Sequence, residues 1–170
     1  MGNIQIIEGD ITKAVVDAIV NAANPIMLGG GGVDGAIHRA AGPELLEECR
    51  KVKAIDGIRC PFGEARITSA GNLNCKYVIH TAGPIYDRES DPEQVLRDSY
   101  TNCLDLAIEH GCKSIAFPAI SCGAYGYPIE SAAKISLDVC RDIKYKGLDI
   151  IFYLFGREIT QIWMAQNESG

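Results

Sequence analysis

Short hydrophobic runs alternate along this chain with longer segments in which hydrophobic residues recur every three or four positions. The short runs are rich in β-branched residues and predict strands at 3–7, 17–22, 64–70, 77–82, 114–120 and 148–155. The last two runs are almost continuously hydrophobic, which is typical of strands buried on both faces. We therefore expect a sheet that is covered on both sides.

The longer segments supply the covering helices. Their periodicity predicts helices at 43–54, 92–110, 128–144 and 157–166, and a further helix follows the glycines at 29–32. The helix at 92–110 has the clearest boundaries, because Asp91 and Pro92 precede it and Gly111 follows it. Strands interleaved with helices predict an α/β protein, with a three-layer α/β/α sandwich as its architecture.

Composition narrows the class of protein. The chain has 170 residues, of which 47% are hydrophobic and 22% charged, so we expect a single domain over residues 1–170. A net charge of -6 argues against a general nucleic-acid or anionic-membrane binder. The N-terminus has no long hydrophobic run, so neither a signal peptide nor a membrane span is expected. Seven cysteines without a C-x-x-C pair are typical of reduced thiols in a cytoplasmic protein.

Two glycine-rich segments follow predicted strands, GGGG at 29–32 and SCGAYGYP at 121–128. Each leads into a helix, whose first backbone N–H groups and dipole attract an anion such as a diphosphate. Neither segment is a Walker A motif, because no Gly-Lys-Ser/Thr follows. Gly30, Gly32 and Gly35 have the spacing of a dinucleotide-binding turn, but this turn does not leave its strand directly. A nucleotide-dependent oxidoreductase therefore has little support.

Asp34 is the strongest catalytic candidate. It lies in the first turn of the helix after the glycines, where a carboxylate also stabilises a helix without any catalytic role. Asn24, at the end of a strand and before Pro25, favours the catalytic interpretation. An amide beside a carboxylate suits a ribose diol and leaves the carboxylate free to activate water. A third loop, EGDIT at 8–12, presents Asp10 after the first strand.

Other reactive side chains are weaker candidates. His38 lies one turn after Asp34 and on the same helical face, where a purely local contact is the more common role. His80 lies in a strand between small and hydrophobic residues, so a buried histidine with satisfied hydrogen bonds is expected. Cys122 has no histidine-containing partner segment, which favours a small loop residue over a nucleophile.

Six segments, in order, carry a family resemblance: GDIT at 9–12, DAIVNAAN at 17–24, GGGGVDGAIHRAAG at 29–42, CPFGEARIT at 60–68, VIHTAGP at 78–84 and AFPAISCGAYGYP at 116–128. With these segments the chain resembles the macrodomain family, specifically the MacroD-type branch that includes bacterial O-acetyl-ADP-ribose deacetylases. The resemblance implies a mixed, mostly parallel sheet of six or seven strands between helices.

The resemblance also implies a site for ADP-ribose. Asp10, with the backbone of Ile11, would bind the adenine amino group, and Phe155 would lie beside the adenine ring. Backbone N–H groups would bind the diphosphate and the distal ribose, from Gly32, Val33, Ser121, Cys122, Gly123, Ala124 and Tyr125. Asn24 would hold the distal ribose, and Asp34 would be the catalytic carboxylate.

The activity implied is hydrolysis at the distal ribose, without a metal or another cofactor. The substrates would be O-acetyl-ADP-ribose and proteins that carry mono-ADP-ribose on acidic side chains, and the protein would act as a monomer. A macrodomain that binds ADP-ribose without turnover is the alternative. The sequence departs from the branch at Pro25, Ile26 and Met27, where small polar residues are usual, and at Cys122, where Thr or Ser is usual.

Overall fold

The computed structural model describes residues 3–170 and contains one six-stranded sheet with the order β1-β6-β5-β2-β4-β3. The strands are β1 (Asn3–Glu8), β2 (Ala18–Ala22), β3 (Ala65–Ser69), β4 (Tyr77–Thr81), β5 (Ser114–Phe117) and β6 (Asp149–Leu154). Every neighbouring pair is parallel except β3 with β4, which is antiparallel. The predicted mixed, mostly parallel sheet is therefore confirmed with six strands.

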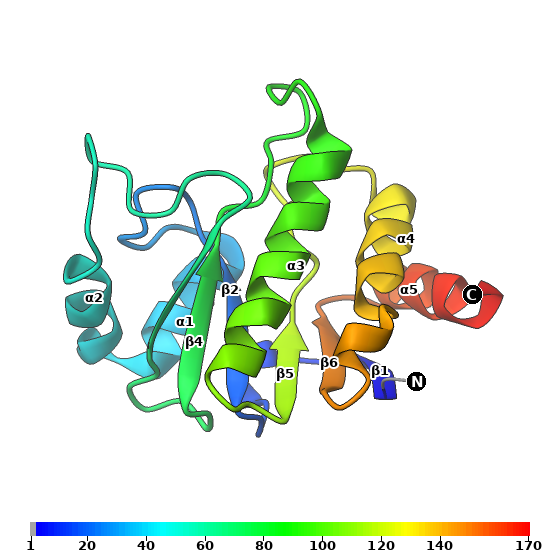
Figure 1. Ribbon diagram of the computed structural model, residues 1–170, viewed down its shortest axis with the longest axis horizontal. Helices are drawn as coiled ribbons and strands as arrows, with labels where there is room; N and C mark the ends of the chain where they lie inside the picture. The colour runs from blue at the N-terminus through cyan, green and yellow to red at the C-terminus, as the bar shows by residue number, and fades with distance from the viewer. Residues whose placement is uncertain (1–2) are drawn as a thin grey trace.

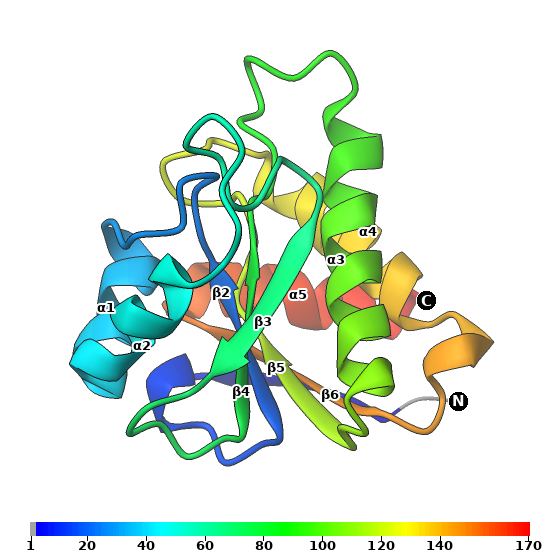
Figure 2. The ribbon, with the colours of Figure 1, turned by 60° about the vertical axis from the view of Figure 1, so that its left-hand side comes forward.

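Helices lie on both sides of this sheet, as Figures 1 and 2 show for α3 and α4 on one side and α1 and α2 on the other. The helices are α1 (Gly32–Ala41), α2 (Pro43–Arg50), α3 (Pro92–Glu109), α4 (Ile129–Cys140) and α5 (Arg157–Ser169). Two short 3-10 helices, η1 (Ile11–Lys13) and η2 (Ile143–Tyr145), lie in connections. The three-layer α/β/α sandwich is confirmed. Among the described residues, no helix is both long enough and hydrophobic enough to cross a bilayer.

The two faces of the sheet have different cores. Under α3, α4 and α5, four fully buried aromatic rings form a continuous cluster, with centroids 5.0 to 6.2 Å apart: Tyr100, Phe117, Phe152 and Trp163. Under α1 and α2 the core is mainly aliphatic and includes Ile19, Met27, Ile37 and Leu45. Burial of each such side chain contributes about 1.5–3 kcal/mol. This packing holds the loops at the strand ends in place.

Three predicted elements end at least three residues earlier than expected. The strand predicted at 114–120 stops at Phe117, because Pro118 has no N–H to continue the ladder. The helix predicted at 128–144 ends at Cys140, and Asp142 then accepts a hydrogen bond from the backbone N of Lys144 at 2.9 Å to begin η2. Such local bonds from aspartate compete with a continuing helix. The helix predicted at 43–54 ends at Arg50.

The ladder between β2 and β5 is short. β2 pairs with β4 along its whole length, whereas its pairing with β5 covers only Ala18 with Ile115 and Ile19 with Ala116. Beyond these residues β2 and β5 no longer pair with each other, and each strand continues into a glycine-containing loop. In open α/β sheets, ligands bind beyond the carboxyl ends of strands at such a place.

Candidate functional site

The residues predicted to form the site gather at one edge of the sheet. β1, β2, β5 and β6 run parallel, so their carboxyl ends meet at that edge (Figure 1). The segments that follow these four strands begin at Gly9, Ala23, Pro118 and Phe155. Together with the first turn of α1, they contain all the candidate ligand-binding residues. The tertiary structure thus unites segments that are far apart in the sequence.

Asp34 is the third residue of α1, and it is only 4% exposed. Its Oδ1 accepts a hydrogen bond from Asn21 Nδ2 at 2.8 Å and lies 3.4 Å from Nε2 of His38. Burial raises the pKa of this carboxyl group, while the Asn21 hydrogen bond and the nearby His38 oppose that shift. A helix-start aspartate with no further role would lie in solvent, so this environment favours the catalytic interpretation.

Gly30 leaves a small space beside Asp34. A Cβ at this position would lie 3.1 Å from Oδ2 of Asp34 and 3.3 Å from Nδ2 of Asn24. Both contacts are tighter than an ordinary van der Waals contact, so a side chain here would crowd the carboxylate and the amide. The bare glycine therefore leaves Oδ2 of Asp34 and Nδ2 of Asn24 uncovered by any side chain at this position. The sequence predicted Gly30 to be part of a glycine-rich anion-binding loop, but nothing in the sequence indicates which side chains surround it.

Asn24 is held by its own loop. Its Nδ2 donates to the Gly29 carbonyl at 3.1 Å, and its Oδ1 accepts from the Met27 backbone N at 2.9 Å. Met27 has a φ of 66°, which is unusual for a residue other than glycine, and its side chain is 1% exposed. The unusual residue at position 27 therefore fills the core and shapes the turn. Nδ2 of Asn24 also lies beside Gly30, 3.3 Å from the point that a Cβ on Gly30 would occupy.

The N-terminus of α1 forms one side of the expected diphosphate site. Its N-cap is Gly31, and no side chain caps the helix. The first backbone N–H groups of a helix have no partner within the helix, so those of Gly32 and Val33 are available to an anion. Val33 is half-buried, so its side chain anchors this turn while its backbone faces outward.

The loop after β5 forms the other side. It closes on itself through hydrogen bonds from Gly126 N to Gly123 O at 3.0 Å and from Tyr127 N to Ser121 O at 2.9 Å. Ser121 has a φ of 66°, and its hydroxyl donates to the Pro84 carbonyl at 2.8 Å. A Cβ on Gly123 would contact nothing within 4 Å. The loop is thus fixed by its own hydrogen bonds and borders open space at Gly123.

Cys122 and Tyr125 have different surroundings within the loop after β5. Burial raises the pKa of Cys122 to about 12, so the thiol stays protonated at neutral pH. This favours its interpretation as a small loop residue over a nucleophile. The Tyr125 ring packs edge-on against Phe62, with centroids 6.5 Å apart, and its carbonyl accepts from the Tyr86 backbone N at 2.9 Å. Phe62 and Tyr86 thus border the loop after β5, and they are 40% and 36% exposed. The sequence did not indicate that these two residues lie near the candidate site.

The segments expected to bind adenine follow two neighbouring strands. Glu8 of β1 pairs with Leu154 of β6, so the next residues of both strands emerge side by side. Phe155 is 91% exposed, which leaves its ring free to stack on a base. Asp10 accepts through Oδ1 from both the N and the Oγ1 of Thr12, at 2.9 and 2.7 Å, and Oδ2 takes part in neither bond. Ile11 is 4% exposed and anchors this turn.

Behind Asp34 lies a buried polar group that extends into the sheet. His80 is fully buried, with Nδ1 3.2 Å from Asn21 Nδ2 and Nε2 2.9 Å from Thr68 Oγ1, as expected of a core histidine. Burial lowers its pKa to about 3. Asn21 was missed as a site residue. The sequence did contain one indication of its role. Asn21 is a polar residue in a predicted buried strand, where its side chain requires a hydrogen-bond partner.

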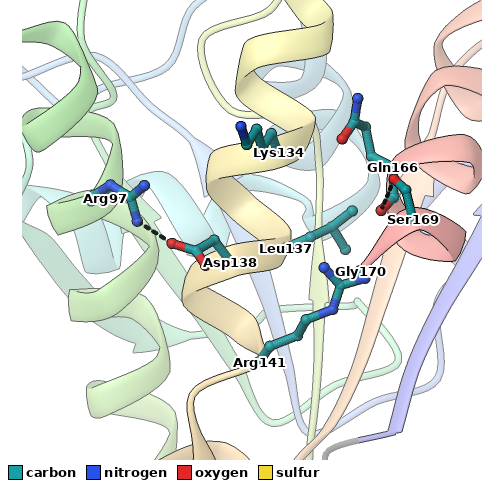
Figure 3. A pocket seen from close by; sticks show the side chains of 8 residues that line it. All are labelled: Arg97, Lys134, Leu137, Asp138, Arg141, Gln166, Ser169 and Gly170. Atoms are coloured by element: carbon teal, nitrogen blue, oxygen red, sulfur yellow. Dashed lines mark hydrogen bonds and ion pairs between the residues drawn. The ribbon is translucent and has the colours of Figure 1, made fainter.

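A cavity of about 250 Å³ lies elsewhere, between α3, α4 and α5 (Figure 3). Three of its charged side chains already have partners, since Arg97 contacts Asp138 at 2.7 Å and Arg141 donates to the Asn167 carbonyl at 2.7 Å. None of the predicted site residues lines it. Within residues 3–170, no group of three His, Cys, Asp or Glu side chains is arranged to hold a metal ion.

The fold and this edge define the class of protein: an α/β sandwich with a candidate ligand site at the carboxyl ends of its parallel strands. The Macro domain family model matches residues 20–136. A macro domain-containing protein from Vibrio parahaemolyticus is 61% identical over 96% of both chains. An O-acetyl-ADP-ribose deacetylase from Citrobacter rodentium is 52% identical, over 94% of this chain and 92% of that protein. The chain belongs to the Macro domain family.

Solved structures agree with this assignment. The Oceanobacillus iheyensis macrodomain with ADP has a TM-score of 0.92 and 42% identity, over 96% of this chain and 89% of that one. The Trypanosoma brucei macrodomain in complex with ADP-ribose has a TM-score of 0.85 and 38% identity, over 99% of this chain and 69% of that one. The resemblance found from the sequence motifs is therefore confirmed.

Proposed function

We propose that this protein binds ADP-ribose and hydrolyses ester bonds at its distal ribose. The substrates would be O-acetyl-ADP-ribose and proteins with mono-ADP-ribose on Asp or Glu side chains. Relatives named as O-acetyl-ADP-ribose deacetylases and neighbours solved with ADP and ADP-ribose support this proposal. Adenine would lie between Asp10 and Phe155, the diphosphate between the α1 N-terminus and residues 121–125, and the distal ribose at Asn24.

The observation that carries the proposal is the buried Asp34 carboxylate, which Asn21 holds through Oδ1 at 2.8 Å while no side chain at Gly30 covers Oδ2. A water molecule next to Oδ2 would give a proton to that oxygen while its own oxygen forms a bond to the ester carbonyl carbon. The bond from that carbon to the ribose oxygen then breaks, and the ribose oxygen takes the proton from Asp34 to become a hydroxyl. A carboxyl group whose pKa is raised by burial is a stronger base than an exposed one, which suits this step.

The bound diphosphate would position the reacting ribose, so the rate would depend on geometry as much as on the base. For ADP-ribose linked to an Asp or Glu side chain, attack of water at the anomeric carbon is the alternative route, and it uses the same base. The two routes differ in the atom that receives the oxygen of water. Hydrolysis of an Asp/Glu-ADP-ribosylated peptide in ¹⁸O-labelled water distinguishes them, because attack at the carbonyl places the label in the released carboxyl group and attack at the anomeric carbon leaves that group unlabelled.

The function is tested by incubating the protein with O-acetyl-ADP-ribose, and separately with Asp/Glu-ADP-ribosylated protein, followed by mass spectrometry of the products. We expect acetate and ADP-ribose from the first substrate and free ADP-ribose from the second. Asp34→Asn serves as the inactive control, because it keeps the size of the side chain and removes the base.

A reader that binds ADP-ribose without turnover is the second candidate. One observation favours it: both polar atoms of the Asn24 side chain already bond within their own loop, to Gly29 and Met27. Tight ADP-ribose binding by calorimetry, together with no product from either substrate, would establish the reader and exclude the hydrolase.

A further inference from the structure

Four polar side chains form one buried chain that ends at Asp34. Thr68 Oγ1 lies 2.9 Å from His80 Nε2, His80 Nδ1 lies 3.2 Å from Asn21 Nδ2, and Asn21 Nδ2 lies 2.8 Å from Asp34 Oδ1. Thr68 is 8% exposed, Asp34 is 4% exposed, and the other two are fully buried. Asn21 and His80 are register partners in β2 and β4, so their side chains share one face of the sheet.

The positions of the hydrogen atoms along this chain follow from the distances. If the Asn21 amide were turned over, its oxygen would lie 2.8 Å from a carboxylate oxygen, and two acceptors would repel each other. The amide nitrogen therefore donates one hydrogen to Asp34 and the other to Nδ1 of His80. With Nδ1 as an acceptor, His80 carries its proton on Nε2 and donates to Thr68 Oγ1. The Thr68 hydroxyl in turn donates to the Ser69 carbonyl at 2.9 Å.

His80 keeps this direction fixed because it does not become charged under ordinary conditions. Burial lowers its pKa to about 3, so Nδ1 remains an acceptor at any pH near neutrality. A protonated ring would donate from Nδ1 and force the Asn21 amide to turn over. The neutral ring therefore selects the orientation in which Asn21 donates to Asp34.

The orientation of the Asn21 amide lowers the stability of the folded state. Its Oδ1 is buried and has no hydrogen-bond partner among residues 3–170. A buried acceptor without a partner destabilises the folded state, and a hydrophobic residue would avoid that penalty. A polar residue kept in the sheet core under these conditions points to a role beyond folding.

We propose that Asn21 and His80 are positioning residues for Asp34, a proposal that rests on the proposed hydrolytic function. Asn21 holds Oδ1, so that Oδ2 faces Gly30, and its hydrogen bond favours the ionised carboxylate against the effect of burial. His80 fixes the Asn21 amide in the donating orientation. Both side chains are fully buried and reach the reacting atoms only through Asp34.

Two other titratable groups face Asp34, and neither stabilises its negative charge. The stabilising effect comes from the Asn21 hydrogen bond and from His38. On α2, burial and the charge of Asp34 raise the pKa of Cys49 to about 11. In the loop after β5, burial and the same charge raise the pKa of Tyr125. Both groups are neutral near pH 7, so neither offsets the burial of the carboxylate. His38, on α1 itself, contacts the same Oδ1 at 3.4 Å and lowers the pKa of Asp34 in the same direction as Asn21.

The decisive measurement is the titration of the Asp34 carboxyl carbon by ¹³C NMR, which needs no substrate. In Asn21→Leu, which keeps the side-chain size but removes the donor, we expect the midpoint to rise by about one pH unit or more. At a pH below that midpoint, kcat should fall by about tenfold or more, while the ADP-ribose Kd stays within about twofold. Ser136→Ala, a buried polar change on α4, is the control and should leave both the midpoint and kcat unchanged.

A pair of changes at His80 tests the second link without altering any neighbour of the substrate. His80→Phe removes the acceptor for Asn21 and should raise the Asp34 midpoint, whereas His80→Gln restores an acceptor oxygen and should bring it back toward the wild-type value. An unchanged midpoint in folded Asn21→Leu, or equal midpoints in wild type and His80→Phe, overturns the proposal. If the wild type releases no product but these shifts occur, the positioning network stands and the hydrolytic function fails.

Discussion

Asn21 donates a hydrogen bond to Oδ1 of Asp34 over 2.8 Å, and this contact leaves the other carboxylate oxygen directed at Gly30. Oδ2 lies 3.1 Å from the point that a Cβ on Gly30 would occupy. A carboxylate held through one oxygen presents the other in a defined direction, which general base catalysis requires. Changes at Asp34 and at Gly30 therefore test the site most directly.

Asp34→Ala should separate binding from catalysis. The change removes the base but leaves both phosphate-binding segments intact, so we expect ADP-ribose binding by calorimetry to persist. Deacetylation should fall by about 100-fold or more, the usual range for the loss of a general base. Asp138→Ala, an exposed change on α4, is the matched control and should keep full activity. Unchanged turnover in Asp34→Ala would remove Asp34 from the catalytic role.

Gly30→Ala should crowd both Asp34 and Asn24. Its methyl group would stand 3.1 Å from Oδ2 and 3.3 Å from Nδ2, and contacts this tight would displace the carboxylate and the amide. We expect initial rates to fall by about 100-fold, because displacement by about 1 Å is enough for such a loss. Gly147→Ala, which meets nothing within 4 Å, controls for the change of glycine itself. Rates equal in both variants would mean that the reacting oxygen lies elsewhere.

Gly123→Glu should abolish ADP-ribose binding without unfolding the protein. The new side chain would enter open space beside the loop after β5, where its charge would face the diphosphate. Like charges brought together at an interface cost several kcal/mol, so calorimetry should show a loss of about 100-fold or more in affinity. Gly123→Gln has nearly the same size without the charge and should lose less. Equal affinities for Glu, Gln and wild type would show that the diphosphate binds elsewhere.

Phe155→Ala should weaken binding through the adenine ring alone. The side chain is 91% exposed, so its removal should change the free energy of unfolding by no more than about 0.5 kcal/mol. Stacking of a base on an aromatic ring contributes about 1–3 kcal/mol, which predicts about tenfold weaker ADP-ribose binding. Calorimetry with ADP-ribose and with ribose 5-phosphate checks the assignment, because only the first should lose affinity. Ile143→Ala, also exposed, is the control for surface truncation.

The buried carboxylate of Asp34 should lower stability at neutral pH. Its pKa is raised above the ordinary value of 3.8, so the folded state binds a proton more tightly than the unfolded state. Stability is therefore lost as the pH rises through 3.8 and then through the raised folded pKa. Asp34→Asn should have a higher Tm than wild type near pH 7, and this difference should shrink as the pH falls toward 3.8. A difference that is independent of pH would contradict the raised pKa.

Much of the architecture follows from local sequence patterns. Short hydrophobic runs located all six strands, because each strand needs a buried face regardless of its partners. The glycine-rich segments 29–32 and 121–128 indicated loops that lead into helices, and the motifs identified the family. Element ends were less exact, because a single proline at 118 or aspartate at 142 ends an element through local chemistry that periodicity does not register.

The sequence by itself determined the sheet, the family and the candidate residues Asp34 and Asn24, since these depend on local pattern and motif. Only the tertiary structure decided which oxygen of Asp34 is free, because that depends on Asn21 and His80, which lie 59 residues apart along the chain. The tertiary structure also showed why a side chain at Gly30 would interfere, since that depends on the atoms around this position. Hydrogen bonds between distant segments form only when the sheet brings them within about 3 Å, and no local pattern encodes that distance.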